Sequence, residues 1–142
     1  MRRLTWTTLV LVAACGGGRD TSTAPKQIAG TYNLATINGA APPVPVYYDI
    51  AGNLTEEIIA ASYTVNANGT FSDFATVRVT ENRTVTTRSE TCAGTFTQNG
   101  NTLSFAEAPS GTACGNTYAA IWDGNNALTV ALNATQQEVF RR

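Results

Sequence analysis

The chain has 142 residues, with 9 basic and 10 acidic side chains, a formal net charge of −1 and no histidine. Because no cluster of basic residues alternates with aromatic ones, the composition argues against a nucleic-acid surface. The lack of histidine removes the usual general base, the serine–histidine sites of many hydrolases and the commonest metal ligand. We therefore expect neither an enzyme nor a protein that holds a metal or another cofactor.

The first 14 residues are organised like an export signal. Arg2 and Arg3 make its start positive, and Leu4–Ala14 is an uncharged, mostly apolar run. That run is too short to cross about 30 Å of hydrocarbon as a helix. At its end, Val12-Ala13-Ala14-Cys15 resembles the lipobox of bacterial lipoproteins, in which small residues precede the cysteine that receives the lipid.

The lipobox resemblance implies a location for the protein. It implies cleavage before Cys15 and two or three acyl chains on that residue, which would anchor the protein far more firmly than one chain could. Gly16 stands where an aspartate would otherwise be expected in inner-membrane lipoproteins, which implies the outer membrane of a bacterial cell envelope. An ordinary secretory signal followed by a chance cysteine is the alternative.

The cysteine count agrees with an exported protein. Acylation of Cys15 leaves Cys92 and Cys114 as an even pair in an oxidising compartment, so we expect one disulfide between them. In the chain-entropy model, closing such a loop stabilises the fold by ~3 kcal/mol. A redox-active or metal-binding pair is the alternative, but the C-x-x-C spacing and any histidine are missing.

Composition divides the remaining chain into a tether and one domain. Residues 15–27 are small and polar, cannot bury enough apolar surface to fold alone and are predicted to form a flexible tether. Residues 28–142 are enough for a single domain with one core. Because threonine, asparagine, alanine and glycine are abundant and charged residues are sparse, we expect an all-β domain with tight turns.

Short runs of alternating apolar and polar residues predict eight or nine strands. Asn68-Gly69 and Asn99-Gly100 are the clearest hairpin turns. A helix competes only at 55–61, and the prolines at 42, 43 and 45 restrict their segment to an edge strand or a rim loop. The expected segments are 28–37, 44–50 as a short strand or rim loop, 55–65, 71–80, 84–90, which either runs on from the preceding strand or turns back, 92–98, 102–107, 117–122, 127–132 and 135–142.

A meander of this kind protects its edges most simply by closing into an up-and-down barrel. Gly30-Thr31-Tyr32 resembles the G-x-W motif that opens lipocalins, with tyrosine in place of tryptophan. The resemblance implies a lipocalin-like barrel over 28–142, in which Arg141 or Arg142 of the last strand packs over the Tyr32 ring. If Val139 points inward, Arg141 is that residue. The alternative is that Tyr32 is a core residue of some other antiparallel barrel or sandwich.

An eight-stranded barrel is just wide enough to be filled by side chains or to hold one small ligand. Because many aromatic residues are available, we expect a largely filled barrel with a shallow pocket near one mouth for a small apolar molecule. Asp73 alternates with inward positions, so it is either a polar group of that pocket or a residue at a bulge or rim. The candidate ligand-lining residues are Tyr48, Tyr63, Phe71, Asp73, Phe96, Phe105, Tyr118 and Trp122.

Two other functions have to be weighed. By fold analogy alone, the domain could be an envelope interaction module such as a hydrolase inhibitor, with loop 108–116 projecting outward to a protein partner that the sequence does not identify. An enzyme would instead require clustered carboxylates with raised pKa values in a cleft. Glu56 and Glu57 are adjacent and would point to opposite faces of a strand, so they do not form such a pair.

Overall fold

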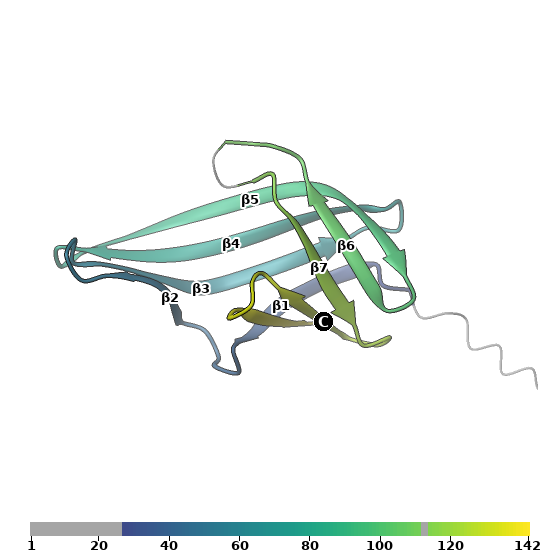
Figure 1. Ribbon diagram of the computed structural model, residues 1–142, viewed down its shortest axis with the longest axis horizontal. Helices are drawn as coiled ribbons and strands as arrows, with labels where there is room; N and C mark the ends of the chain where they lie inside the picture. The colour runs from purple at the N-terminus through teal and green to yellow at the C-terminus, as the bar shows by residue number, and fades with distance from the viewer. Residues whose placement is uncertain (1–26, 112–113) are drawn as a thin grey trace, which may run out of the picture.

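The computed structural model describes residues 27–111 and 114–142, which contain nine β-strands and no helix (Figure 1). The predicted signal, the lipidation site Cys15 and all but the last residue of the predicted tether lie outside these residues. Within them, no helix is long and apolar enough to cross a membrane. The strands are β1 (Gly30–Ile37), β2 (Val44–Asp49), β3 (Leu54–Val65), β4 (Thr70–Glu81), β5 (Thr84–Asn99), β6 (Thr102–Glu107), β7 (Thr117–Trp122), β8 (Ala127–Ala131) and β9 (Gln137–Arg141).

All strand pairings are antiparallel, and the sheet closes on itself. The order is β1-β9-β8-β7-β6-β5-β4-β3-β2, and β1 also pairs with β3, from Gly30 opposite Val65 to Asn33 opposite Ser62. Eight strands therefore form a closed barrel, and β2 is an extra strand beside the first part of β3. This confirms the predicted all-β meander that closes into a small barrel.

Three strands are longer than the barrel needs. β3, β4 and β5 have 12, 12 and 16 residues, and with β2 they project beyond the barrel at the left of Figure 1. We call this projecting part, β2 with residues 54–58, 77–81 and 84–88, the extension. The β4–β5 ladder runs unbroken from Thr70 opposite Thr95 to Glu81 opposite Thr84, so the segments predicted at 84–90 and 92–98 are one strand.

The segment for which a helix competed is the first part of β3. Glu57 and Glu56 face opposite sides of the strand, as expected; Glu57 pairs with an arginine of the neighbouring strand β4, and Glu56 pairs with an arginine of β5, the strand beyond β4. Glu57 accepts from Arg78 Nε at 2.7 Å, and Glu56 accepts from both terminal nitrogens of Arg88 at 2.8 and 3.0 Å. These cross-strand ion pairs are available only to the extended conformation, which outweighs the helix propensity of this segment.

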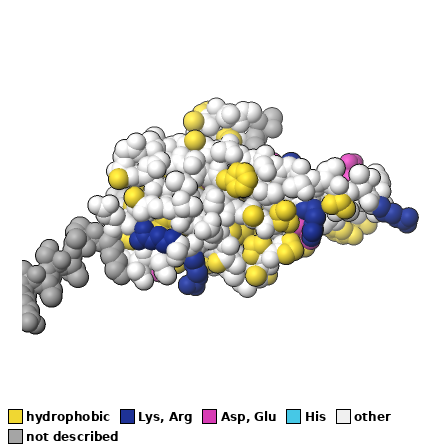
Figure 2. Space-filling model, turned by 180° about the vertical axis from the view of Figure 1, so that it is seen from behind, with side chains coloured by type: hydrophobic (Ala, Val, Ile, Leu, Met, Phe, Trp, Pro, Cys, Tyr) yellow, Lys and Arg dark blue, Asp and Glu magenta, His cyan; other side chains and the backbone are white. Residues whose placement is uncertain are grey.

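The extension exposes much of its apolar surface. Tyr48, Ile50 and Val85 are 67%, 78% and 59% exposed, and Figure 2 shows apolar side chains on this end of the molecule, with charged ones among them. Tyr48 was a candidate ligand-lining residue, and the structure contradicts that expectation. It lies on the edge strand β2, outside the closed barrel.

The barrel interior is filled by apolar side chains over most of its length. Tyr32 is fully buried, and its hydroxyl donates to the carbonyl oxygen of Ile28 at 2.7 Å. The buried cluster comprises Ile28, Tyr32, Tyr63, Val65, Phe71, Leu103, Phe105, Ala120, Trp122, Leu128, Val130 and Phe140. This agrees with the expectation of a largely filled barrel.

The arginine that packs over the Tyr32 ring is Arg142, not the predicted Arg141. The guanidinium of Arg142 lies 5.3 Å from the centre of the Tyr32 ring and donates to the carbonyl oxygen of Ala29 at 2.9 Å. Phe140, not Val139, is the fully buried residue, so Arg141 points outward, and the exposed Arg142 that follows β9 is the arginine that lies over Tyr32. Gly30, at φ 152°, leaves room for this arginine, because a Cβ there would lie 3.1 Å from its Nη1.

Candidate ligand-binding pocket

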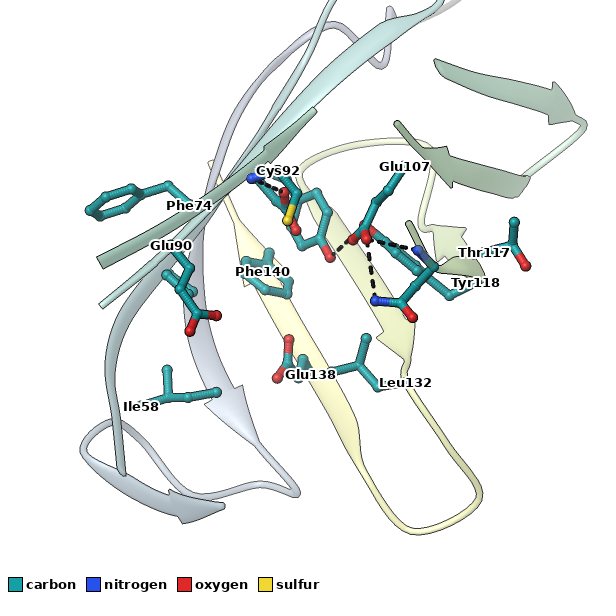
Figure 3. Close-up of a pocket in the computed structure, with 15 residues that line it drawn as sticks. Ile58, Phe74, Glu90, Cys92, Glu107, Thr117, Tyr118, Leu132, Glu138 and Phe140 are labelled. Atoms are coloured by element: carbon teal, nitrogen blue, oxygen red, sulfur yellow. Dashed lines mark hydrogen bonds between the residues drawn. The ribbon is translucent and has the colours of Figure 1, made fainter. Parts of the chain in front are cut away.

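A cavity of about 430 Å³ lies at the mouth of the barrel from which the extension projects (Figure 3). Its walls are inward-facing side chains of β3, β4, β5, β6, β7 and β9, so strands distant in the sequence meet around it. The volume is within the range of small-molecule sites. The residues that line it are Ile58, Ala61, Tyr63, Asp73, Phe74, Ala75, Glu90, Cys92, Glu107, Asn116, Thr117, Tyr118, Leu132, Glu138 and Phe140.

The floor of the cavity is a layer of aromatic rings. The Tyr63 ring centre lies 4.8 Å from that of Phe140, edge to face, and 5.7 Å from that of Phe105. The Tyr118 ring stacks on Phe105 at 5.5 Å, and Phe71 contacts Phe105 at 4.6 Å. Because period two places each of these rings inward on its strand, the layer follows directly from the alternation in the sequence.

Two hydroxyl groups give this apolar floor a polar edge. Tyr63 donates from its hydroxyl to the hydroxyl of Tyr118 at 3.1 Å. Burial is the main cause that raises the pKa of both phenols, so both stay protonated at neutral pH. The Tyr118 hydroxyl therefore keeps a proton that it can donate to a group in the cavity.

The wall above the floor is acidic. Asp73 of β4, Glu90 of β5, Glu107 of β6 and Glu138 of β9 all line the cavity, and Figure 3 shows the three glutamates converging from different strands. Glu90 accepts a hydrogen bond from Arg88 Nε at 2.9 Å. Within residues 27–111 and 114–142, no ion pair involves Asp73, Glu107 or Glu138.

Burial and mutual repulsion raise the pKa of two of these carboxyl groups. Loss of hydration, followed by the negative charge of Glu107, raises the pKa of Asp73 to about 6, although its Oδ1 accepts from the Cys92 N–H at 3.1 Å. Burial also raises the pKa of Glu138, and a hydrogen bond from Gln136 at 3.1 Å offsets part of that effect. The cavity therefore holds negative charge that the protein does not neutralise well.

The predicted disulfide is present and lies in the same wall. Cys92 of β5 is bonded to Cys114 in the loop after β6, with the two Cα atoms 5.6 Å apart. Beyond Cys114, the backbone N–H groups of Gly115 and Asn116 donate to Glu107 Oε2 at 2.9 and 3.0 Å. The disulfide thus holds the loop where its N–H groups position the Glu107 carboxylate.

Among residues 27–111 and 114–142, one group of side chains resembles a metal site, and it lies in this wall. Ligand atoms of Asp73, Cys92 and Glu107 lie within 4.8 Å of one another. Cys92 is bonded to Cys114, however, and a disulfide sulfur cannot supply the thiolate that a metal requires. Two carboxylates are left, which falls short of the six to eight oxygen ligands that Ca²⁺ takes.

The structure brings together only some of the predicted lining residues. Tyr63, Asp73 and Tyr118 line the cavity, while Phe71 and Phe105 form the layer beneath its surface. Phe96 packs against Phe105 with its ring centre 5.8 Å away and does not reach the cavity. Trp122 is also misplaced by the prediction, because β7 starts at the mouth and carries Trp122 toward the opposite end of the barrel.

Sequence reasoning missed Glu107 and Glu138, although a signal for both was present. Glu107 continues the inward series of Leu103 and Phe105, and Glu138 lies two residues before the buried Phe140. Extending the period of two by one step would have placed both carboxylates inside the barrel. Because an unpaired carboxylate is seldom buried, the acidic character of both residues instead favoured an exposed position.

Comparisons with known proteins do not assign this chain to a family. No protein-family model matches the chain, and no curated protein sequence matches it significantly. The class is therefore defined by the structure alone: a closed eight-stranded antiparallel barrel with one extra strand, and a cavity with an aromatic floor and an acidic wall at one mouth.

Replacing Asp73 by asparagine should stabilise the fold at neutral pH. The pKa of Asp73 is about 6 in the folded protein against an ordinary value of 3.8, so the folded state binds this proton more tightly than the unfolded state does. Stability from this group is therefore highest below pH 4 and is lost as the pH rises through 6. After discounting for solvent screening of a half-buried group, Asp73→Asn should gain on the order of 1 kcal/mol at pH 7.5.

Urea unfolding at pH 7.5 and pH 4 measures this effect. The gain should fall to a small fraction of that value at pH 4, because Asp73 is protonated in the folded state there and this pH is close to the unfolded-state pKa of 3.8. Glu81→Gln, at the exposed β4–β5 turn, is the matched control and should change stability little at either pH. A gain that is equal at the two pH values, or a loss at pH 7.5, would contradict the electrostatic account of Asp73.

Proposed function

We propose that the protein is a bacterial envelope lipoprotein, anchored through lipid on Cys15, whose barrel binds a small molecule in the mouth cavity. The observation that carries the binding proposal is the concave cavity of about 430 Å³ above a rigid aromatic layer. Sites of this size bury most of a small ligand against apolar walls, with a few polar groups that orient it. The lipobox and the export signal support the anchor, and the outer membrane is the proposed location.

The likeness to lipocalins supports the same proposal. Gly30 and Tyr32 open the first strand, and Arg142 of the chain end lies over the Tyr32 ring, as the family pattern would place it. This contact closes the barrel at the end opposite the cavity. One end is thus sealed and the other is open, which is the arrangement that a ligand carrier requires.

An acid–base enzyme is the second candidate, because clustered carboxylates with raised pKa are the feature expected of one. Asp73 and Glu107 are close together, and the pKa of Asp73 is about 6. We prefer binding because Glu107 Oε2 already accepts hydrogen bonds from two backbone N–H groups and from Asn116 Nδ2. An inhibitor that uses loop 108–116 is less well supported, since these donors tie part of the loop to the cavity wall.

The test uses the full chain carrying Cys15→Ser. This variant should move from the membrane to the soluble fraction, and native mass spectrometry should find it with a small molecule bound. Ala61 lines the cavity, whereas Ala60 is its exposed neighbour on the opposite face of β3, so they form a matched pair. Ala61→Phe should lose the bound molecule and Ala60→Phe should keep it.

Three results would count against the proposal. Retention of Cys15→Ser in the membrane fraction would reject the lipid anchor. Equal retention of the small molecule by Ala61→Phe and Ala60→Phe would place binding outside the cavity. Conversion of the bound molecule to a new product on incubation would favour the enzyme.

A further inference from the structure

We propose that the ligand of the mouth cavity is a compact organic cation: an ammonium group attached to a small aromatic or aliphatic body. This inference rests on the proposed small-molecule binding and adds the charge of the ligand. It modifies the expectation from sequence that the ligand is simply apolar. The structural basis is the combination of an aromatic floor with an acidic wall in which, among the described residues, only Glu90 has an arginine partner.

Positive charge is distributed unevenly around the cavity. In the part of the chain that the structure describes, the cationic side chains are five arginines, and none of them forms an ion pair with Asp73, Glu107 or Glu138. Arg78 pairs with Glu57 on the outer face of β3, and Arg88 pairs with Glu56 and Glu90 at the rim of the extension. The others are Arg83 in the β4–β5 turn, Arg141 on the exterior and Arg142 over Tyr32.

Without a positively charged partner, the buried carboxylates of Asp73 and Glu138 destabilise the folded protein. Glu138 is only 5% exposed, and Asp73 is half-buried beside Glu107. A buried carboxylate is destabilising unless a positive charge or several hydrogen bonds compensate it. An ammonium group beside Asp73 and Glu138 would provide that compensation, whereas an anion would add to the repulsion.

The aromatic floor and the size of the cavity argue against a bare ion as the ligand. The cavity floor presents the Tyr63, Tyr118 and Phe140 side chains, which offer ring surface to an apolar body. Aromatic rings also attract a cation that lies within about 6 Å of their faces. A volume of about 430 Å³ is far larger than a bare metal ion fills, and Asp73 and Glu107 alone make a poor metal site.

The experiment compares three probes of nearly equal shape by isothermal titration calorimetry on the full chain carrying Cys15→Ser. The probes are 2-phenylethylammonium, neutral 2-phenylethanol and anionic phenylacetate, and CaCl₂ is titrated separately. Because charge-assisted hydrogen bonds are stronger than neutral ones, the ammonium probe should bind at least about tenfold more tightly than the alcohol. Phenylacetate should bind most weakly.

A pair of isosteric substitutions tests the carboxylates directly. Asp73→Asn with Glu138→Gln should reduce affinity for the ammonium probe by roughly tenfold or more and leave affinity for the alcohol within about twofold. Glu81→Gln, which removes one negative charge far from the cavity, controls for long-range electrostatics and should leave both affinities unchanged. Both carboxylate changes keep the side-chain shape, so the aromatic floor should stay in place.

The outcomes distinguish a wrong charge assignment from failure of the proposed small-molecule binding. If the alcohol binds as tightly as the ammonium, and Ala61→Phe abolishes both, the cavity binds small molecules but the charge assignment is wrong. If none of the three organic probes binds, both the charge assignment and the proposed binding of small aromatic molecules fail. If CaCl₂ binds through Asp73 while the ammonium probe does not, the site is a metal site and the inference is overturned.

Discussion

Gly94→Ala should destabilise the protein by about 3 kcal/mol, at the upper end of what overpacking costs. Gly94 lies on β5 directly opposite Glu107 of β6. A Cβ at this position would overlap the carbonyl oxygen of Ala106 and would lie 2.8 Å from the Cα of Glu107. These are backbone atoms of a paired strand, so the clash can be relieved only if β5 and β6 move apart.

The same substitution should also weaken ligand binding. Moving β6 away from β5 displaces Glu107, whose carboxylate forms part of the cavity wall beside Asp73. Urea unfolding measures the stability change, and titration with 2-phenylethylammonium measures the change at the site. Gly100→Ala is the control: φ is 61° there and nothing lies within 4 Å, so only the backbone cost of ~1 kcal/mol applies. Equal losses for the two variants would show that β5 and β6 accommodate the methyl group.

Closure of the barrel could be predicted because it depends on local signals. Asn68-Gly69 gives a hairpin turn with Gly69 at φ 82°, and Asn82 and Arg83 form the next turn, both with positive φ. Between such turns, alternation with period two fixes which face of each strand is apolar. Strands β2 to β9 each pair with their neighbours in sequence, and β1 closes the barrel by pairing with both β9 and β3.

Two of the errors, the choice of Arg141 and the omission of Glu138, have one physical cause. In β9, the sequence offers two inward sets: Val139 with Arg141, or Glu138 with Phe140 and Arg142. The prediction of Arg141 assumed the first set, with Val139 inward, and the structure adopts the second. The wrong choice placed Arg141 over Tyr32 and also hid Glu138 from the expected pocket, so one assumption about burial produced both errors.

The position of Tyr48 could not be predicted from alternation alone. The β2–β3 ladder has a register shift between Pro45 and Tyr47, which changes the face on which the following residues lie. In addition, β1 occupies the place beside β3 that a barrel strand would need, from Ser62 to Val65, so β2 pairs only with the extension. Both facts depend on distant pairing rather than on the local sequence.

Removing the disulfide, with Cys92→Ala and Cys114→Ala together, should lower the free energy of unfolding by ~3 kcal/mol, as expected for a loop of this length. The two cysteines are 22 positions apart, and the bond connects β5 to the loop that follows β6. Urea unfolding with and without a reducing agent measures the effect. Reduction should bring the parent chain to the stability of the double variant and leave the double variant unchanged. Equal stability of the parent and the double variant under oxidising conditions would contradict the prediction.

Removing the disulfide should also change the pH dependence of ligand binding at the cavity, in addition to lowering stability. Without the bond to Cys92, the N–H groups of Gly115 and Asn116 are no longer held against the Glu107 carboxylate. With fewer hydrogen bonds to stabilise its charge, the Glu107 carboxylate repels the Asp73 carboxylate more strongly. The pKa of Asp73, about 6 in the parent, should therefore rise in the double variant. Asp73 would be partly protonated near neutral pH, and an ammonium ligand would lose part of its counter-charge. Binding measured between pH 5 and 8 should therefore shift its midpoint upward in the double variant, whereas a disulfide that only stabilises the fold would leave the midpoint unchanged.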